Sequence, residues 1–286
     1  MYTENPEITP EDRARLERSF GLDQPVTVQY VKWLGRVLQG DLGYSLIERR
    51  PVLTIVTERL GNTLYLVGLS LIISLVISSI AGVVSAYRQY SLLDHVTTFL
   101  ALVGYSLPIF WSGLVSIVIF AVWLRWFPAG GMYTLGQDPT FLDRLQHTVL
   151  PVSILSLFFT GYYSRFIRGS VLEVKNQDYI RVARSKGVKE LQIFIRHAAK
   201  NAAIPVVTLI ALNLPTMFAG ALFTETIFTW PGMGRLFWQA ATRRDYPILM
   251  ALITITAALV ILSNLLADIL YGVLNPQIRE EMSSTK

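Results

Sequence analysis

The sequence predicts an all-α membrane protein whose helices cross the bilayer five times. Hydrophobic residues make up 52% of its 286 residues and charged residues only 16%, whereas a soluble domain carries about 25% charged residues. The apolar residues lie in long blocks, and Lys and Arg gather between the blocks. The net charge of +5 therefore fits anionic lipid headgroups, so we expect the lipid bilayer and no nucleic acid among the partners.

Five stretches are long enough to cross the hydrocarbon core, which takes roughly 20 apolar residues in a helix. None of them contains Asp, Glu, Lys or Arg, and Trp and Tyr cluster near their ends as interfacial anchors. Together they predict a transmembrane domain over residues 60–275. The predicted spans are 60–87, 95–124, 145–164, 201–224 and 246–267.

The segment 165–200 sets the predicted orientation. It holds nine Lys or Arg and three acids, so the positive-inside rule places it in the cytoplasm. Alternation then puts the tail 276–286 inside, and residues 1–59 and the loop 225–245 outside. The polar segment 1–59 would have to cross the membrane without a preceding signal sequence or span. We therefore expect either that Met1 is an internal start or that an earlier helix precedes this sequence.

The same cytoplasmic segment predicts a short basic helix over 179–186. Asp178 can cap its beginning and Gly187 its end, and Arg181 and Arg184 load its second half, where the helix dipole favours cations. A helix of two turns is marginal alone in water, so it gains most by packing into a groove on a partner. The alternative is a solvated positive-inside loop. The length of the segment and its ordered cap, helix and stop favour docking.

The loop 225–245 predicts a second short helix. Pro231-Gly232 and Gly234 mark tight turns, and apolar residues then follow at helical spacing. We expect a re-entrant or interfacial helix that caps the bundle rather than a direct substrate contact.

Three asparagines, Asn62, Asn213 and Asn264, are the strongest polar groups within the predicted spans. Buried amides between membrane helices usually hydrogen-bond a neighbouring helix, and this is the favoured interpretation. Asn213 and Asn264 are also candidates for polar groups along a transport pathway.

Catalysis finds no support in the sequence. It has no cysteine, its three histidines are scattered without metal-ligand spacing, and it has no G-x-x-x-x-G-K-[ST] pattern for binding phosphate. We therefore expect no enzyme activity, no metal site and no nucleotide bound by this chain. The predicted spans also lack an ionisable residue that could carry a coupling ion, so uphill transport would take its energy from a cytoplasmic partner.

Six motifs follow one another along nearly the whole chain. They are GLDQPVTVQYVKWLGRVLQGDLGYSL (21–46), SLPIFWSGL (106–114), QDYIRVARSKG (177–187), RHAAKNAAIP (196–205), ETIFTWPGMGRLFWQAATRRDYP (225–247) and ADILYGVLNPQIR (267–279). In this order they resemble the B-type permease subunit of bacterial ABC importers for dipeptides, oligopeptides and nickel. That family usually has six spans, with one helix before the segment that begins here. Its docking loop more generally has Glu-Ala where this chain has Arg181-Val182.

The resemblance implies the peptide-type permease fold and a subunit that forms half of a translocation pathway in the inner membrane of a bacterium or archaeon. The partners it implies are a homologous second permease, two cytoplasmic ABC ATPases that bind ATP and Mg, and an extracytoplasmic substrate-binding protein, with no cofactor on this chain. It assigns ATPase docking to Asp178, Tyr179, Arg181, Ala183, Arg184 and Gly187. Its extracytoplasmic loop motif comprises Glu225, Pro231, Gly232, Gly234, Asp245, Tyr246 and Pro247.

Several alternatives stay open at this point. The same machinery could import nickel or oligosaccharides in place of peptides. A secondary transporter or channel would need no ATPase, although the absence of charge within the spans argues against ion coupling. A membrane scaffold without transport is a further alternative, and the proline-rich spans and the motifs argue against it.

Overall fold

A computed structural model describes residues 23–194 and 199–274, and within these ranges the regular secondary structure is helical apart from one isolated β-bridge between Tyr44 and Pro51. The predicted tail 276–286, the first 22 residues and positions 195–198 of the basic segment lie outside the described residues. The helices are α2 (Val26–Leu38), α3 (Val52–Tyr87), α4 (Leu92–Ser106), α5 (Ile109–Ser116), the π-helical η2 (Ile117–Trp123), α6 (Phe141–Lys175), α7 (Asp178–Ser185), α8 (Glu190–Ile193), α9 (Ala199–Ile227), α10 (Met233–Arg243) and α11 (Tyr246–Leu274).

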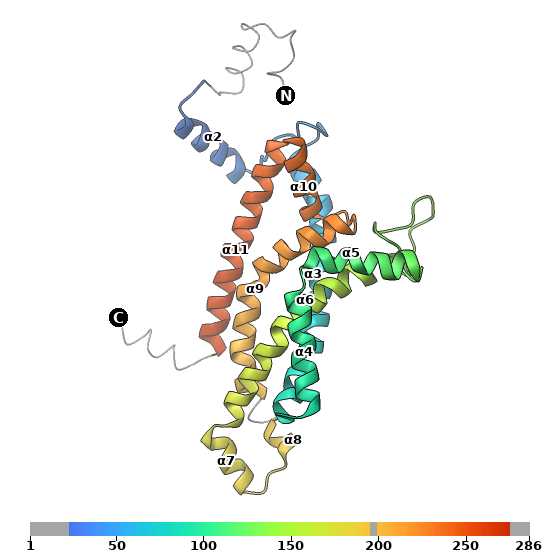
Figure 1. Cartoon of the computed structure of the whole chain (residues 1–286). Helices are drawn as coiled ribbons and strands as arrows, with labels where there is room; N and C mark the ends of the chain where they lie inside the picture. The colour runs from blue at the N-terminus through green and yellow to red at the C-terminus, as the bar shows by residue number, and fades with distance from the viewer. Residues whose placement is uncertain (1–22, 195–198, 275–286) are drawn as a thin grey trace, which may run out of the picture.

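The long helices form an elongated bundle with α6 near its centre. Figure 1 shows α7 and α8 at one end of the bundle, α10 and α2 at the other end, and α5 projecting to the side. We call these two ends the α7 end and the α10 end. α6 packs against α3, α4, α5 and α9, and its most extensive contact is with α3.

Small residues on α3 allow its close approach to α6. Ser70, Ser74, Ser78 and Gly82 recur every four residues, and the three serines are buried. Ser156 on α6 donates a hydrogen bond to the Ser70 carbonyl at 3.2 Å. A Cβ atom at Gly82 would lie 2.8 Å from the carbonyl oxygen of Ser164, so only glycine fits there. This is the small-residue spacing that lets two membrane helices pack closely.

The opposite side of α6 uses glycine in the same way. A Cβ atom at Gly161 would lie 2.4 Å from the carbonyl oxygen of Ala101 on α4, and one at Gly104 would lie 3.2 Å from the carbonyl oxygen of Leu157. The backbones of α4 and α6 therefore approach each other so closely that no side chain separates them at Gly161.

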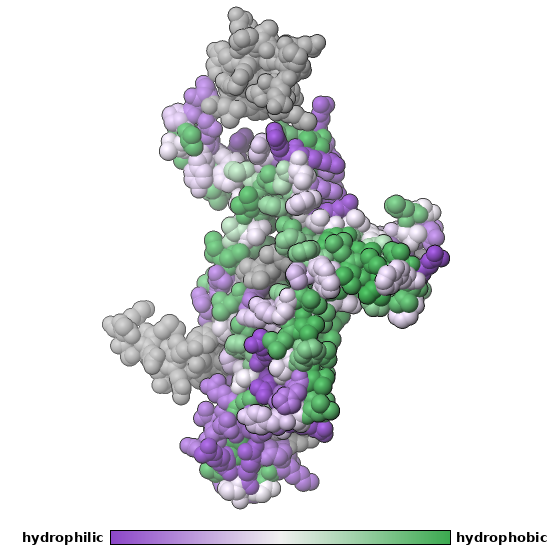
Figure 2. All heavy atoms as spheres, in the orientation of Figure 1, coloured by the Kyte–Doolittle hydropathy of each residue, from purple (hydrophilic) through white to green (hydrophobic). Residues whose placement is uncertain are grey.

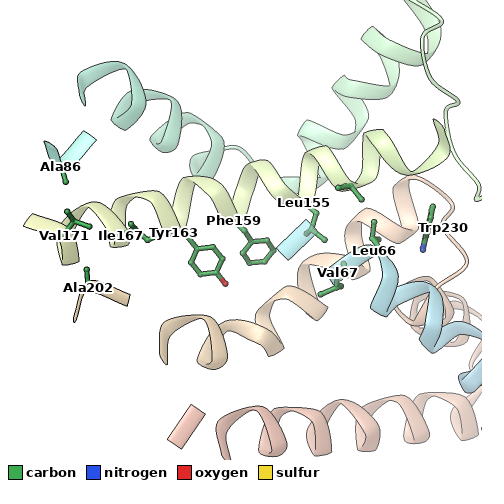
Figure 3. Packing of buried hydrophobic residues seen from close by; sticks show 12 residues of the cluster. Leu66, Val67, Ala86, Leu155, Phe159, Tyr163, Ile167, Val171, Ala202 and Trp230 are labelled. Carbon is green, nitrogen blue, oxygen red and sulfur yellow. The ribbon is translucent and has the colours of Figure 1, made fainter. Parts of the chain in front are cut away.

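Larger side chains fill the bundle between these close contacts. Leu66 on α3 and Leu155, Phe159 and Tyr163 on α6 are buried in one cluster, which reaches Trp230 at the α10 end. Figure 3 shows Leu155, Phe159 and Tyr163 following one another along α6. The core is thus a line of contacts along one helix, as expected for an elongated bundle.

The length and composition of the helices support membrane spans, although the count of five remains a prediction. Among the described residues, α3 and the stretch Tyr246–Leu266 of α11 are long and apolar enough to cross a membrane. α4 and the segment formed by α5 and η2 meet at a bend of 99°. They form a third candidate span if this bent pair is counted as one. The predicted spans 145–164 and 201–224 lie within α6 and α9. Over the described residues, neither of these helices contains a stretch as long and apolar as those of α3 and α11.

The bend in the predicted span 95–124 has a local cause. Pro108 disfavours a helical conformation at the residue before it, and Leu107 has φ −76° and ψ 129°, in the extended region. The predicted span 95–124 is therefore divided into two helices, α4 and α5, at Pro108. Figure 2 shows apolar side chains over the middle of the bundle and on the projecting arm, and hydrophilic residues gathered at the α7 end.

Two predicted boundaries also move. α3 begins at Val52, and Glu58 and Arg59 lie within it, although the span was predicted from residue 60. α6 continues to Lys175, so the predicted loop 165–200 begins as helix. Absence of charge defines how much of a helix can lie in lipid, but it does not mark where hydrogen bonding along the backbone stops.

Gly161→Leu should disrupt the contact between α4 and α6, because its side chain would meet the α4 backbone. Overpacking of this kind costs about 1–3 kcal/mol or more, so the melting temperature of the detergent-solubilised protein should fall. Gly169→Ala on the same helix is the matched control, since a Cβ atom there meets nothing within 4 Å. Equal melting temperatures for the two variants would contradict the proposed packing.

Candidate functional site

The basic segment at the α7 end folds around a small apolar cluster. Ile180 on α7 and Ile193 on α8 are both 1% exposed and pack together, with Ala183, Val188 and Phe194 against them. The short helix predicted over 179–186 is therefore present with little shift, as α7. It is held by its own tertiary contacts, although a helix of this length is marginal alone in water.

Gly187 ends α7 as predicted, and the geometry gives the reason. Its φ is +74°, a left-handed conformation that favours glycine. The N–H of Gly187 donates to the Arg184 carbonyl at 2.9 Å, and the N–H of Val188 donates to the Ala183 carbonyl at 3.3 Å. This pair of bonds is the Schellman motif, which satisfies the last carbonyl groups of a helix.

The predicted cap at the start of α7 is wrong. Asp178 is the first residue of the helix, and Gln177 occupies the N-cap position without a side-chain hydrogen bond. The Asp178 carboxylate is almost fully exposed and lies 3.4 Å from Arg181 one turn later. Asp178 therefore acts as a negative charge near the positive end of the helix dipole rather than as a capping acceptor.

An ion pair closes the segment after the turn. Arg184 Nε lies 2.5 Å from Glu190 Oε1, and its second nitrogen NH2 lies 3.2 Å from Oε2. The hydrogen bonds from Arg184 lower the pKa of Glu190, and the same bonds raise the pKa of Arg184. Since both side chains are partly exposed, the pair fixes geometry more than it adds stability.

The docking candidates divide into two groups on α7. Ala183 and Arg184 turn inward to the apolar cluster and the Glu190 ion pair. Tyr179, Arg181 and Val182 are exposed, and Tyr179 Oη also accepts a hydrogen bond from Asn201 on α9 at 2.9 Å. The exposed face therefore mixes an aromatic ring, a cation and an apolar side chain, and sequence reasoning did not single out Val182.

A buried glutamate organises the α10 end. Glu225, at the end of α9, is 0% exposed. Its carboxylate accepts hydrogen bonds from Thr63 Oγ1 at 2.6 Å and from the N–H groups of Gly234 and Arg235 at 2.7 and 3.1 Å. Thr63 in turn accepts from the N–H of Met233 at 2.8 Å. The free N–H groups at the start of α10 thus bind one carboxylate and one hydroxyl group.

Glycines let this carboxylate approach so closely. A Cβ atom at Gly232 would lie 2.2 Å from Glu225 Oε1, and one at Gly234 would lie 2.5 Å from the Cα of Leu222. The structure therefore brings Glu225, Gly232 and Gly234 together, and the short helix expected in this loop is present as α10.

Trp230 and Pro231 attach the same motif to α3. Asn62 Nδ2 donates to the Pro231 carbonyl at 2.8 Å, and Trp230 Nε1 donates to the Asn62 carbonyl at 3.1 Å. The Trp230 ring is fully buried and stacks on Tyr65, with centroids 6.1 Å apart. The Asn62 side chain therefore bonds to the turn before α10, whereas the sequence favoured a bond to a neighbouring helix.

Asp245 binds the chain that precedes α3. It is 2% exposed and accepts hydrogen bonds from Ser45 Oγ and from the N–H of Leu46 at 3.2 Å. The neighbouring Tyr246 is exposed at the first turn of α11, with Pro247 after it. Asp245 therefore fixes the turn after α2 rather than pairing with a cation.

The two pathway candidates lie on different helices. Asn213 on α9 donates to the Leu209 carbonyl of its own helix at 2.8 Å, and Asn264 is exposed on α11. No contact between the two side chains is found among the described residues.

Sequence reasoning missed the partners of the buried acids. Thr63 and Ser45 are ordinary hydroxyl residues in sequence, and each is far along the chain from the acid it contacts. Asp94 and Arg168 were likewise passed over, although they form a buried ion pair. The one available signal was the position of each acid directly beside a long apolar block.

Glu225→Ala should destabilise the α10 end, because it leaves the Thr63 hydroxyl and two N–H groups of α10 without their acceptor. A buried unsatisfied group costs about 1–3 kcal/mol, so thermal unfolding followed by tryptophan fluorescence should shift to lower temperature. Asp138→Ala, at an exposed loop position, is the control and should leave the transition unchanged. An unaltered transition in Glu225→Ala would show that the carboxylate is dispensable.

The chain is similar to curated peptide permeases over nearly its whole length. It is 43% identical over 275 residues to the oligopeptide transport system permease protein AppB of Bacillus subtilis. It is 39% identical over 295 residues to the dipeptide transport system permease protein DppB of Escherichia coli and 38% identical over 292 residues to the di/tripeptide permease DppB of Pseudomonas aeruginosa. Each match covers 96% of this chain and 87% of the relative.

The fold is similar to that of solved transporters despite low sequence identity. An inward-facing structure of the MetNI methionine ABC transporter matches with a TM-score of 0.62 at 15% identity, over 77% of this chain and 96% of that chain. An amino acid ABC transporter solved with histidines matches with a TM-score of 0.53 at 15% identity, over 76% of this chain and 93% of that chain. The all-helical architecture is therefore that of an ABC importer permease.

The model of the binding-protein-dependent transport system inner membrane component matches residues 63–280, which include every long helix from α3 onward apart from the first turns of α3. The resemblance found in the sequence is confirmed, and the chain belongs to this family of inner membrane transport components.

Proposed function

We propose that this chain is the permease subunit of an ATP-driven importer for peptides and that it forms half of the translocation pathway. The substrate class rests on the names of relatives from three bacteria, which transport oligopeptides, dipeptides or di- and tripeptides. The remaining parts of the importer would be a homologous second permease, two cytoplasmic ABC ATPases and an extracytoplasmic binding protein. Nickel and oligosaccharides are the alternative cargoes.

One observation carries this proposal: α7 presents an exposed face on a segment that is otherwise firmly held. Ile180 anchors the buried side, the Arg184–Glu190 ion pair closes the turn, and Tyr179 bonds to α9. A short helix fixed in this way can receive a force from a partner without unfolding. A freely solvated loop would need no buried anchor.

In the proposed importer the α7 end lies in the cytoplasm and the α10 end lies outside. The dense positive charge of residues 165–200 supports this orientation. α3, the broken pair of α4 with α5 and η2, α6, α9 and α11 would be the five spans. Residues 1–59 and 225–245 would then be extracytoplasmic, with the Glu225 and Asp245 contacts capping the bundle.

The docking role is assigned residue by residue from this geometry. Tyr179 and Arg181 would contact the ATPase directly, with Asp178 beside them. Ala183, Arg184 and Gly187 would position that face through the cluster, the ion pair and the turn. Asn213 and Asn264 stay as the candidates for polar groups on the pathway. ATP binding would move the ATPases together and shift the bundle between two states.

Reconstitution tests the function directly. The full complex of both permeases, both ATPases and the binding protein should import a labelled di- or oligopeptide into ATP-loaded proteoliposomes and should fail with a non-hydrolysable analogue. Competition with unlabelled peptide, nickel and oligosaccharide identifies the cargo class. Uptake by this chain alone without ATP would establish a secondary transporter or channel in place of the proposed function.

Gly187→Val should leave membrane insertion intact and abolish uptake. A Cβ atom there has no neighbour within 4 Å, so the penalty comes from the left-handed backbone, which valine strongly disfavours. Gly187→Asn is the matched control, since asparagine tolerates this conformation and should retain much of the uptake. Normal uptake by an inserted Gly187→Val variant would count against the docking role of this segment.

A further inference from the structure

The α7 end contains an ion pair between a buried aspartate and a partly buried arginine, and it joins three helices. Asp94, in the first turn of α4, is 3% exposed, and Arg168 on α6 holds its carboxylate by two hydrogen bonds. Arg168 Nε lies 2.8 Å from Asp94 Oδ1, and its nitrogen NH2 lies 2.8 Å from Oδ2. The hydroxyl of Ser85, near the end of α3, donates to Oδ1, and the N–H of Tyr90 donates to Oδ2 at 2.9 Å.

The end of α3 is tied to the basic segment at two further points. Lys175, the last residue of α6, donates to the Ala86 carbonyl at 3.3 Å, and its ammonium lies 5.2 Å from the centre of the Tyr87 ring. The Tyr87 ring meets Phe194, just after α8, edge to face at 5.6 Å. The residues before and after α7 thus both contact the last turn of α3.

These contacts resist relative movement of the three helices. A buried carboxylate that loses its cation is left without compensation for its desolvation, so the open arrangement is strongly disfavoured. The two parallel hydrogen bonds also fix the angle between the guanidinium and carboxylate planes. α6 is an unbroken helix between Arg168 and Lys175, and only Asn176 and Gln177 separate it from α7, so a displacement of α7 acts directly on the helix that carries Arg168.

We propose that Asp94 and Arg168 are positioning residues that join α7, the end of α3 and the start of α4 into one rigid unit. A displacement delivered at α7 then reaches α4 without loss. The far end of α4 is the break at Leu107–Pro108, where α4 and α5 meet at 99°. Because helical hydrogen bonding is already interrupted there, the angle between α4 and α5 can change without breaking such bonds. The ion pair therefore transmits movement to the broken span. This inference rests on the proposed ATP-driven function.

Neutral variants distinguish a role of the ion pair in transmitting movement from a role in the stability of the subunit alone. Asp94→Asn and Arg168→Gln each leave one member of the pair without its partner, whereas the double variant leaves no buried charge. The assembled double variant should hydrolyse ATP but import roughly tenfold less peptide per ATP. If the pair served stability alone, the assembled double variant would import with the wild-type ratio, and that result would overturn the proposal.

The exposed Arg50–Glu58 ion pair provides the matched control. Both of its side chains are about half exposed, and it lies at the α10 end of the bundle. Arg50→Gln with Glu58→Gln should leave the ratio of peptide imported to ATP hydrolysed unchanged. An equal loss in this control would show that neutralising any ion pair has the effect, and the inference would fail.

A distance measurement tests rigidity without relying on transport. The chain has no cysteine, so spin labels can be placed at Leu92→Cys and Glu173→Cys, two exposed positions on α4 and α6. In the full complex their distance should be the same with and without ATP, and it should broaden in the double neutral variant. A wild-type distance that changes with ATP would refute the rigid unit. Absence of ATP-dependent uptake in the wild-type complex would instead refute the proposed function.

Discussion

The close approach of α6 to α3 and α4 is the constraint on which the rest of the structure depends. Lipid tails are as apolar as leucine, so helices in a bilayer associate by close packing and hydrogen bonding. Ser70, Ser74 and Gly82 provide that approach on one side and Gly161 on the other. Because α6 is covered on both sides, it does not need the hydropathy of a lipid-facing helix. It can therefore extend to Lys175 and carry the basic segment at its end.

In the described part of the chain the buried acids lie at the two ends of the bundle, and each accepts hydrogen bonds from several donors. Glu225 accepts from the start of α10 and from Thr63, and Asp245 accepts from the turn at Ser45. Asp94 accepts from Arg168. Most buried polar groups in proteins have such partners. At the α10 end the donors are mostly backbone groups, which fix loops. At the α7 end the main donor is an arginine on another long helix, which fixes helices to each other.

The part of the fold that the sequence predicts best is the part set by local rules. The apolar blocks predict where α3 and α11 lie, and Gly187 predicts the end of α7, because length and backbone conformation are local properties. Asp178 was misjudged by one position, since a cap and a first helical residue look alike in sequence. Pro108 accounts for a break in the predicted span 95–124, but the 99° angle depends on packing against α6 and α9.

The sequence by itself determined that the chain belongs in a membrane, that it carries a short basic helix with a defined stop, and that it resembles a permease family. Only the tertiary structure decided which side of α7 is free and which acids are buried. The reason is distance along the chain: Thr63 and Glu225 are separated by 162 residues, and Ser45 and Asp245 by 200. No local pattern relates residues so far apart, and only the packing of α3, α9, α10 and α11 brings them into contact.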